Sequence, residues 1–187
     1  MASRPLELAE YREIVRLLRN GFITENESVF RPNKQIALAL QLEASLGLRV
    51  GDVLALRVNN FRDGKLEIHE EKTGKLQYRD INRGVYDYVR DYAIENQLPP
   101  TAKLFSVGVR AVQDRLKTVT DYLRLENITT HSFRKMYATF AYEENGHNLE
   151  LVKELLNHTS IATTQRYIRV SQQTINTASA KMNFIES

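Results

Sequence analysis

Apolar residues recur at helical spacing along most of this chain, and strict two-residue alternation is confined to one region. The helical spacing predicts helices over residues 6–20, 32–46, 50–56, 82–97, 109–125, 129–146, 148–157, 160–167 and 171–182. The alternation predicts two strands, over residues 65–70 and 76–81, joined by a tight turn. Residues 21–31 show neither pattern and are expected to form a loop. The predicted fold class is therefore mainly α with a small β-hairpin or sheet (α+β).

Glycines and short polar residues mark the expected helix ends. Gly21, Gly47 and Gly146 stand where three of the apolar patterns stop, which is where a left-handed residue commonly ends a helix. The residues expected at helix starts are Asn33, Asn82, Asn148, Ser160 and either Thr129 or Thr130. The first helix is expected to bury Leu8, Tyr11, Val15 and Leu18 on one face.

Length and composition exclude several classes of protein. The 187 residues fit one domain, over residues 1–187, with residues 1–5 as a disordered start or a cloning remnant. No cysteine is present, so disulfides and cysteine-bound metals are excluded. No stretch approaches the roughly 20 apolar residues of a membrane span, and the N-terminus lacks the apolar segment of a signal peptide. These features are typical of a cytoplasmic protein. The net charge of +3 is only mildly basic and does not by itself indicate nucleic-acid binding.

Arg49 stands at the break between two predicted helices, where a side chain can project into a cleft. The planar fork of a guanidinium suits the oxygens of a phosphate. The alternative is an ion pair with Asp52 alone, three residues later.

His131 and Arg134 lie three residues apart near a helix start, so they are expected to share a face. Histidine can transfer a proton, and arginine can bind a phosphoryl oxygen. The alternative is a structural histidine in an ordinary capped helix.

His158 and Tyr167 are separated by a predicted turn and helix start, a spacing that can bring both side chains to one pocket. The alternative for Tyr167 is a core aromatic that packs against Ile161 and Ile168. Lys72 lies on the predicted hairpin turn, from which a cation can reach a bound polymer. Lys75 is a competing candidate for that contact.

Taken together, these segments resemble the tyrosine recombinase (phage integrase) family. Residues 47–57 resemble its first arginine segment, residues 71–75 its lysine hairpin, residues 131–134 its His-x-x-Arg box, and residues 155–167 its final box with the nucleophile. Asn157 departs from the family pattern, which usually has glycine there. A helix C-terminus needs a left-handed residue at this place, and asparagine adopts that conformation most readily after glycine.

The resemblance implies a DNA strand transferase with the tyrosine recombinase catalytic-domain fold, working without metal, ATP or another cofactor. It assigns catalysis to Arg49, Lys72, His131, Arg134, His158 and the nucleophile Tyr167, with Asp52 supporting Arg49. Tyr167 would form a 3′-phosphotyrosyl link, and a DNA 5′-hydroxyl would later attack it to rejoin the strand. The implied function is site-specific recombination of integrase or invertase type, as in mobile elements.

The implied partner is double-stranded DNA in the nucleoid. The chain would be a monomer or weak dimer in solution and a tetramer on DNA. Residues 171–187 would form a C-terminal tail, either exchanged between protomers or packed on its own domain. The family's N-terminal core-binding domain has no counterpart in this sequence. The residues expected to contact DNA on the helix after Gly108 are Arg110, Gln113 and Lys117, besides Lys75 on the hairpin.

Two other functions fit parts of the sequence. The first is relaxation of DNA by a type IB topoisomerase-like enzyme, which uses the same chemistry on a single duplex. The second is a non-catalytic helix-turn-helix module, formed by two helices within residues 151–168 with Ser160 before the second. That module would need neither Arg49 nor Arg134.

Overall fold

The computed structural model describes residues 3–69, 76–158, 160–165, 167 and 168. Its helices are α1 Leu8–Asn20, α2 Lys34–Leu46, α3 Val50–Ala55, the 3-10 helix η1 Val58–Asn60, α4 Arg83–Glu95, α5 Val109–Tyr122, α6 Thr130–Glu144, α7 Leu149–Leu155 and α8 Ile161–Gln165. Its strands are β1 Phe22–Ile23, β2 Val29–Phe30, β3 Phe61–Arg62, β4 Lys65–His69 and β5 Leu76–Asp80. The mainly helical fold class with a small sheet is confirmed. No helix among the described residues is long and apolar enough to cross a membrane.

The chain forms two compact units, residues 1–137 and residues 138–187, and α6 contributes to both. The prediction of one domain over residues 1–187 stays a prediction. The predicted helix over residues 171–182 lies outside the described residues.

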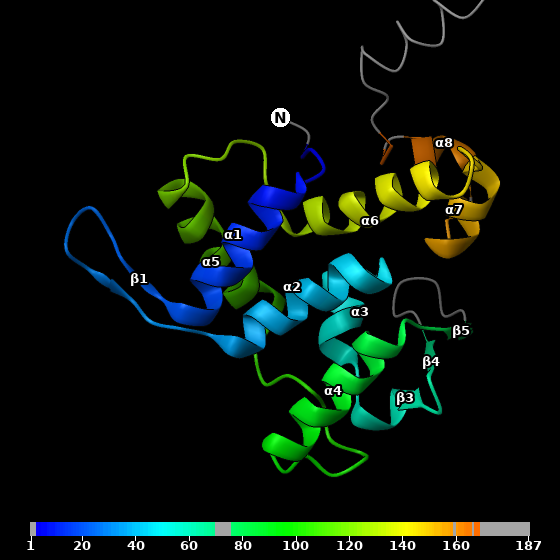
Figure 1. The fold of residues 1–187 in the computed structure, drawn as a ribbon, viewed down its shortest axis with the longest axis horizontal. Coiled ribbons are helices and arrows are strands. Elements are labelled where there is room, and N and C mark those ends of the chain that lie inside the picture. Colours follow the sequence, from blue (N-terminus) through cyan, green and yellow to red (C-terminus); the bar gives the residue numbers. More distant parts are fainter. Residues whose placement is uncertain (1–2, 70–75, 159, 166, 169–187) are drawn as a thin grey trace, which may run out of the picture. The chain divides into compact units, whose positions relative to one another are not determined.

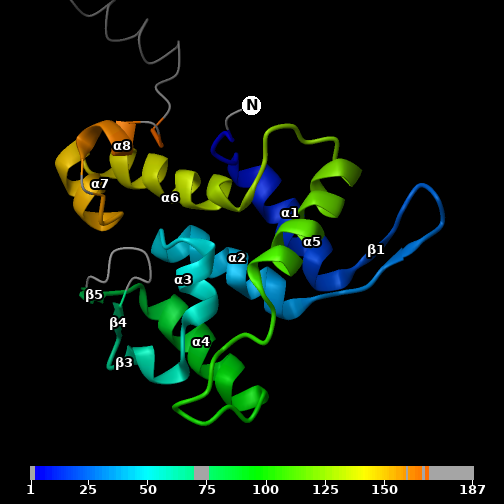
Figure 2. The same ribbon diagram turned by 180° about the vertical axis from the view of Figure 1, so that it is seen from behind.

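Helix α2 forms the centre of the first unit. Its side chains are buried on nearly every side, which is typical of a helix enclosed by other elements. It packs against α1 and α3, and α1 packs in turn against α5 (Figures 1 and 2). Strands β3, β4 and β5 form one antiparallel sheet in that order, beside α4. The side chain of Asn33 accepts a hydrogen bond from the N–H of Ile36, as expected for the residue that caps α2.

Three expectations about this unit are wrong. Residues 21–31 are not a loop, because β1 and β2 pair there in an antiparallel hairpin that extends away from the helices (Figure 1). The Phe22 ring stacks on Phe30 at 4.6 Å, and strands of two residues are too short to show alternation in the sequence. Strand β3 was also missed for this reason. Leu8 is 50% exposed, because α1 begins there, outside the face that packs on α2.

Gly47 ends α2 in the left-handed conformation, with φ at 63°. A β-carbon at this position would lie 2.3 Å from Cδ1 of Tyr137, closer than any real contact. Only glycine satisfies both the backbone angle and the space, so the sharp change of direction between α2 and α3 depends on it.

Gly47→Ala is therefore expected to lower the free energy of unfolding by about 3 kcal/mol, the sum of a left-handed alanine and a displaced tyrosine ring. Urea unfolding followed by circular dichroism measures the change. Gly108→Ala is the matched control, since Gly108 has a negative φ and open space around its α-carbon. Equal stability of the two variants would contradict the role given to Gly47.

The second unit contains α7 and α8. The side chain of Asn148 accepts a hydrogen bond from the N–H of Leu151, as predicted for the cap of α7. Asn157 follows α7 with φ at 51°, so the left-handed conformation expected at this place is confirmed. One expectation is wrong: Tyr167 does not lie on α8, which ends at Gln165, but in the turn that follows. The Tyr167 N–H donates to the carbonyl of Thr164 at 2.9 Å there.

Candidate active site

The end of α2 binds the guanidinium of Arg134. Nη1 of Arg134 donates to the carbonyl oxygen of Gly47 at 2.6 Å, across 87 residues of sequence. A cation is favourable there because carbonyl groups at a helix C-terminus carry partial negative charge. Since Gly47 lies two residues before Arg49, this bond brings Arg134 to the turn that carries Arg49.

Arg49 and Asp52 form an ion pair, with Nη1 and Oδ2 3.8 Å apart. The Asp52 side chain is buried, whereas one fifth of the Arg49 side chain remains exposed. A separation of 3.8 Å is an electrostatic contact and is longer than a hydrogen bond. Arg49 therefore has a compensating charge on its buried side and an exposed part that an anion can approach.

His131 and Arg134 lie one turn apart on α6, as their spacing predicted, but they differ in exposure. His131 is exposed at the first turn of the helix, while Arg134 is 0% exposed. Ser132 lies between them and is buried, and its hydroxyl accepts a hydrogen bond from the N–H of Thr129 at 3.1 Å. That contact fixes the start of the helix, and Thr129 immediately precedes α6, as one of the two alternatives predicted.

Two side chains near the Gly47 turn were not identified from the sequence. Glu43, on α2, is 0% exposed. Its burial raises its pKa well above the usual range of a glutamate, while the positive charge of Arg134 acts to lower that pKa. Arg79, on β5, donates to the carbonyl of Leu46, so a second guanidinium binds the end of α2. Glu43 occupies a position that the apolar pattern of α2 assigns to the core. A charged residue at such a position is the sequence signal that could have identified it.

In the second unit, the rings of His158 and Tyr167 lie 4.9 Å apart at an interplanar angle of 58°. His158 is buried, and its Nδ1 lies 3.1 Å from Oγ1 of Thr164, which is also buried. This hydrogen bond fixes the imidazole, because each ring nitrogen has a defined role once the other has a partner. The side chains of His158 and Tyr167 therefore lie next to each other, as their spacing in the sequence predicted. Tyr167 is half-buried, so its ring is not enclosed as a core aromatic would be.

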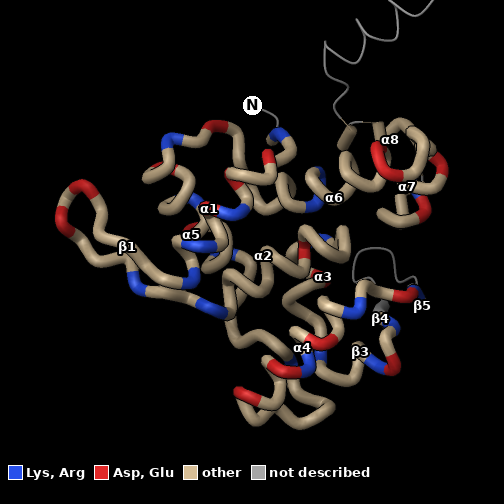
Figure 3. The backbone as a smooth tube through the Cα atoms, in the orientation of Figure 1, with Lys and Arg blue, Asp and Glu red and all other residues tan. Residues whose placement is uncertain are grey.

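The predicted hairpin candidates, Lys72 and Lys75, lie outside the described residues. The three predicted DNA-contacting residues on α5, Arg110, Gln113 and Lys117, are all exposed. Arg110 pairs with Asp114 and Lys117 with Asp121 one turn later. Both signs of charge therefore occur along α5, and Figure 3 marks the charged positions on the backbone. Contact of these residues with DNA stays a prediction.

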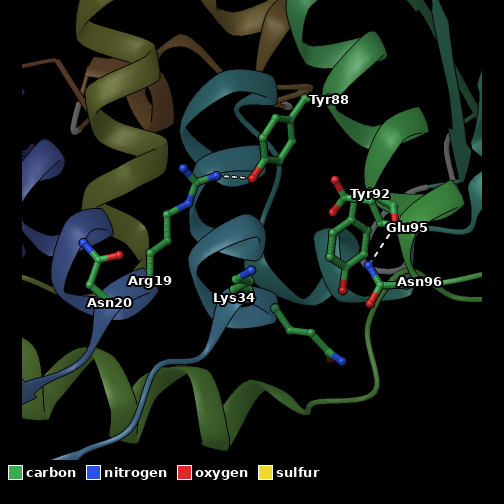
Figure 4. Close-up of a pocket in the computed structure, with 8 residues that line it drawn as sticks. Arg19, Asn20, Lys34, Tyr88, Tyr92, Glu95 and Asn96 are labelled. Atoms are coloured by element: carbon green, nitrogen blue, oxygen red, sulfur yellow. Dashed lines mark hydrogen bonds between the residues drawn. The ribbon is translucent and has the colours of Figure 1, made fainter.

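A cavity of about 570 Å³ lies at the opposite end of α2 from the Gly47 turn. Arg19, Lys34, Tyr88 and Glu95 are among the residues that line it, and Arg19 donates a hydrogen bond to the Tyr88 hydroxyl (Figure 4). It contains none of the predicted catalytic residues. Among the described residues, no group of three or more metal-binding side chains occurs.

The sequence profile described as "Phage integrase family" matches residues 10–174. The chain belongs to this family. It is 27% identical over 151 residues to tyrosine recombinase XerA of Pyrococcus furiosus, an alignment that covers 75% of this chain and 52% of that protein. It is 32% identical over 158 residues to tyrosine recombinase XerC of Roseiflexus castenholzii, covering 75% and 49%.

The fold agrees with solved recombinase structures. The XerH site-specific recombinase bound to its palindromic difH substrate superimposes with a TM-score of 0.73 at 18% identity, over 95% of this chain and 52% of that one. The catalytic domain of bacteriophage HP1 integrase gives a TM-score of 0.65 at 18% identity, over 96% and 95%. The tyrosine recombinase catalytic-domain fold is thereby confirmed.

This chain spans about half the length of the XerA and XerC relatives it matches. The phage integrase profile covers Arg49, His131, Arg134, His158 and Tyr167, since all five lie within residues 10–174. Their chemical roles remain predictions.

Proposed function

We propose that this chain is a site-specific DNA recombinase that cuts and rejoins strands through a covalent link between Tyr167 and a 3′-phosphate. The observation that supports it most directly is the contact of Tyr167 with His158 in a chain of the phage integrase family. A phenol oxygen is a suitable nucleophile because its pKa near 10 makes it a better leaving group than an alkoxide in the reverse step.

The proposed reaction conserves the number of phosphate ester bonds, because one forms as another breaks. The Tyr167 oxygen attacks phosphorus and the bond to the 5′-oxygen breaks, so a phosphotyrosyl link and a 5′-hydroxyl form. His131 takes the phenol proton, and Lys72 gives a proton to the departing 5′-oxygen. Rejoining is the reverse attack by a 5′-hydroxyl, so neither water nor a nucleotide cofactor is consumed. The parts played by His131 and Lys72 are carried over from the family resemblance.

Arg49 and Arg134 neutralise the charge that develops on the non-bridging oxygens in this proposal. Both are held before the DNA arrives, Arg49 by Asp52 and Arg134 by the carbonyl of Gly47. Preorganised donors of this kind lower the barrier because they do not have to reorient during the reaction. His158 donates a further hydrogen bond to the phosphate.

The proposed partner is duplex DNA in the cytoplasm, at the nucleoid. The related XerH structure is a complex with its difH substrate, which supports DNA as the partner here. Arg110, Gln113, Lys117 and Lys75 are the residues we propose to contact it. Binding through phosphates should weaken steeply as salt is raised.

We further propose that four copies assemble on DNA, with residues 171–187 exchanged between them. Truncation after Val170 is expected to leave the fold and DNA binding in place and to abolish the tetrameric complex. Analytical ultracentrifugation of the protein on duplex DNA measures the number of copies. A truncated chain that still forms tetramers would refute the exchange.

The cleavage reaction is tested by capturing the covalent intermediate. The protein is incubated at low salt with nicked duplexes of mixed sequence, which trap cleavage, and the products are separated on a denaturing gel. An SDS-resistant adduct is expected, and sequencing its DNA gives the target site. DNA binding with no adduct would favour the helix-turn-helix module instead. Relaxation of supercoiled plasmid at any sequence would favour the topoisomerase.

A further inference from the structure

The Gly47 turn contains a buried acid to which the proposed reaction gives no task. Glu43 is 0% exposed, and neither of its carboxyl oxygens has a hydrogen-bond partner among the described residues. It lies one helical turn before Gly47, whose carbonyl accepts the hydrogen bond from Arg134 at 2.6 Å. Arg134 is also 0% exposed. A buried carboxyl and a buried guanidinium therefore both lie at the C-terminal end of α2.

Two opposing effects set the protonation state of Glu43. Burial disfavours a carboxylate, and it raises the pKa of Glu43 well above the usual range; Arg134 lowers that pKa by attraction. Arg134 is always charged, so only Glu43 can change its protonation state. Within the described part of the chain, Arg49 and Asp52 at the start of α3 add charge near the Gly47 turn, as does Arg79, which binds Leu46 from β5.

We propose that Glu43 is a proton-linked counter-charge of Arg134, which takes up one proton from solvent when a DNA phosphate binds to Arg134. This inference rests on the proposed contact between Arg134 and the scissile phosphate, for which the enclosed guanidinium must become accessible when DNA binds. Above the raised pKa of Glu43, where its carboxyl is charged, the bound phosphate supplies the negative charge that Glu43 supplies in the free protein. Once the phosphate is bound, a second negative charge on Glu43 is repelled in a buried site, so the neutral carboxyl is favoured. Glu43 acts through Arg134 and is a positioning residue.

The linkage has a definite sign. The protonated form of Glu43 binds phosphate better, so affinity for DNA falls as pH rises through the pKa of Glu43. A single linked proton changes affinity by at most about tenfold for each pH unit. Stability follows the same direction: the folded chain holds this proton more tightly than the unfolded chain, so the free energy of unfolding falls as pH rises above the usual range of glutamate.

The titration of Glu43 can be followed directly. Carbon NMR of protein with carboxyl-labelled glutamate is recorded across pH, first alone, then with sodium sulfate and then with mixed-sequence duplex DNA. Sulfate is a tetrahedral oxyanion that does not titrate in this range. The Glu43 resonance is assigned as the one that is missing from the spectrum of Glu43→Gln. If the Glu43→Gln variant does not fold, Glu43→Asp is used for this assignment. We expect its midpoint to be the highest of the glutamates and to rise further with either anion.

The same proteins are compared in DNA affinity, with Tyr167→Phe included so that cleavage does not contribute. As pH rises through the midpoint of Glu43, the DNA affinity of the chain that keeps Glu43 is expected to fall by up to about tenfold per pH unit. The DNA affinity of Glu43→Gln is expected not to show this fall. A Glu43 midpoint in the ordinary range, or one that neither sulfate nor DNA moves, would overturn the inference. Absence of a covalent adduct would refute the cleavage reaction and leave the sulfate titration valid, so the two failures are distinguishable.

Discussion

Tyr167→Phe is expected to form no covalent adduct with DNA at any enzyme concentration. The substitution removes the one oxygen that bonds to phosphorus, and the ring that contacts His158 at 4.9 Å remains. Because the ring and its packing are kept, DNA affinity and the free energy of unfolding should stay close to those of the unmodified chain. Denaturing gels of the trapped reaction measure the adduct, and fluorescence anisotropy measures binding.

Tyr142→Phe is the matched control for this experiment. Tyr142 also belongs to the second unit and also contacts a histidine ring, that of His147, at 4.9 Å. The Tyr142→Phe variant should form the adduct at an unchanged rate, because the proposed reaction does not use the Tyr142 hydroxyl. An adduct that persists in Tyr167→Phe and disappears in Tyr142→Phe would move the nucleophile to Tyr142. Persistence in both would refute a tyrosine at either place.

Arg134→Leu is expected to lower the free energy of unfolding by about 3–5 kcal/mol and to reduce adduct formation by about a hundredfold or more. The stability loss arises because the buried hydrogen bond to the Gly47 carbonyl is lost and because, above the pKa of Glu43, the buried carboxylate is left without the positive charge that acts on it. The activity loss arises because a preorganised donor to the phosphate is removed. Urea unfolding and the trapping assay measure the two effects separately.

The double variant Glu43→Leu/Arg134→Leu separates charge from packing. If the loss of stability reflects an uncompensated carboxyl, adding Glu43→Leu should recover a large part of it, since replacing both members of a buried pair by apolar residues is often neutral. Adduct formation should stay low in both variants. A double variant as unstable as the sum of the single ones would show that the two side chains do not interact.

Much of the helical framework follows from local pattern. Asn33, Asn82 and Asn148 each accept a backbone hydrogen bond at the start of a helix, as their positions predicted. Caps depend on residues within one turn, so a sequence contains all the information they need. The left-handed Asn157 was predictable for the same reason.

The hairpin at residues 21–31 could not be predicted in this way. Phe22 stacks on Phe30, and its ring centroid also lies 4.3 Å from that of Tyr122. Phe22 and Tyr122 are 100 residues apart in the sequence. Two-residue strands gain little from their own pairing, so the hairpin depends on aromatic contacts with α5. Only the packed fold brings that helix alongside.

For the candidate active site, the sequence by itself determined the residue types and their order, and with them the family. Tertiary structure decided which of those side chains are buried. His131 and Arg134 stand one turn apart on α6, yet His131 is exposed and Arg134 is enclosed, where it binds the end of α2. Glu43 gained its significance in the same way: its pKa is raised because the packed fold excludes water from its carboxyl, and Arg134 acts to lower that pKa.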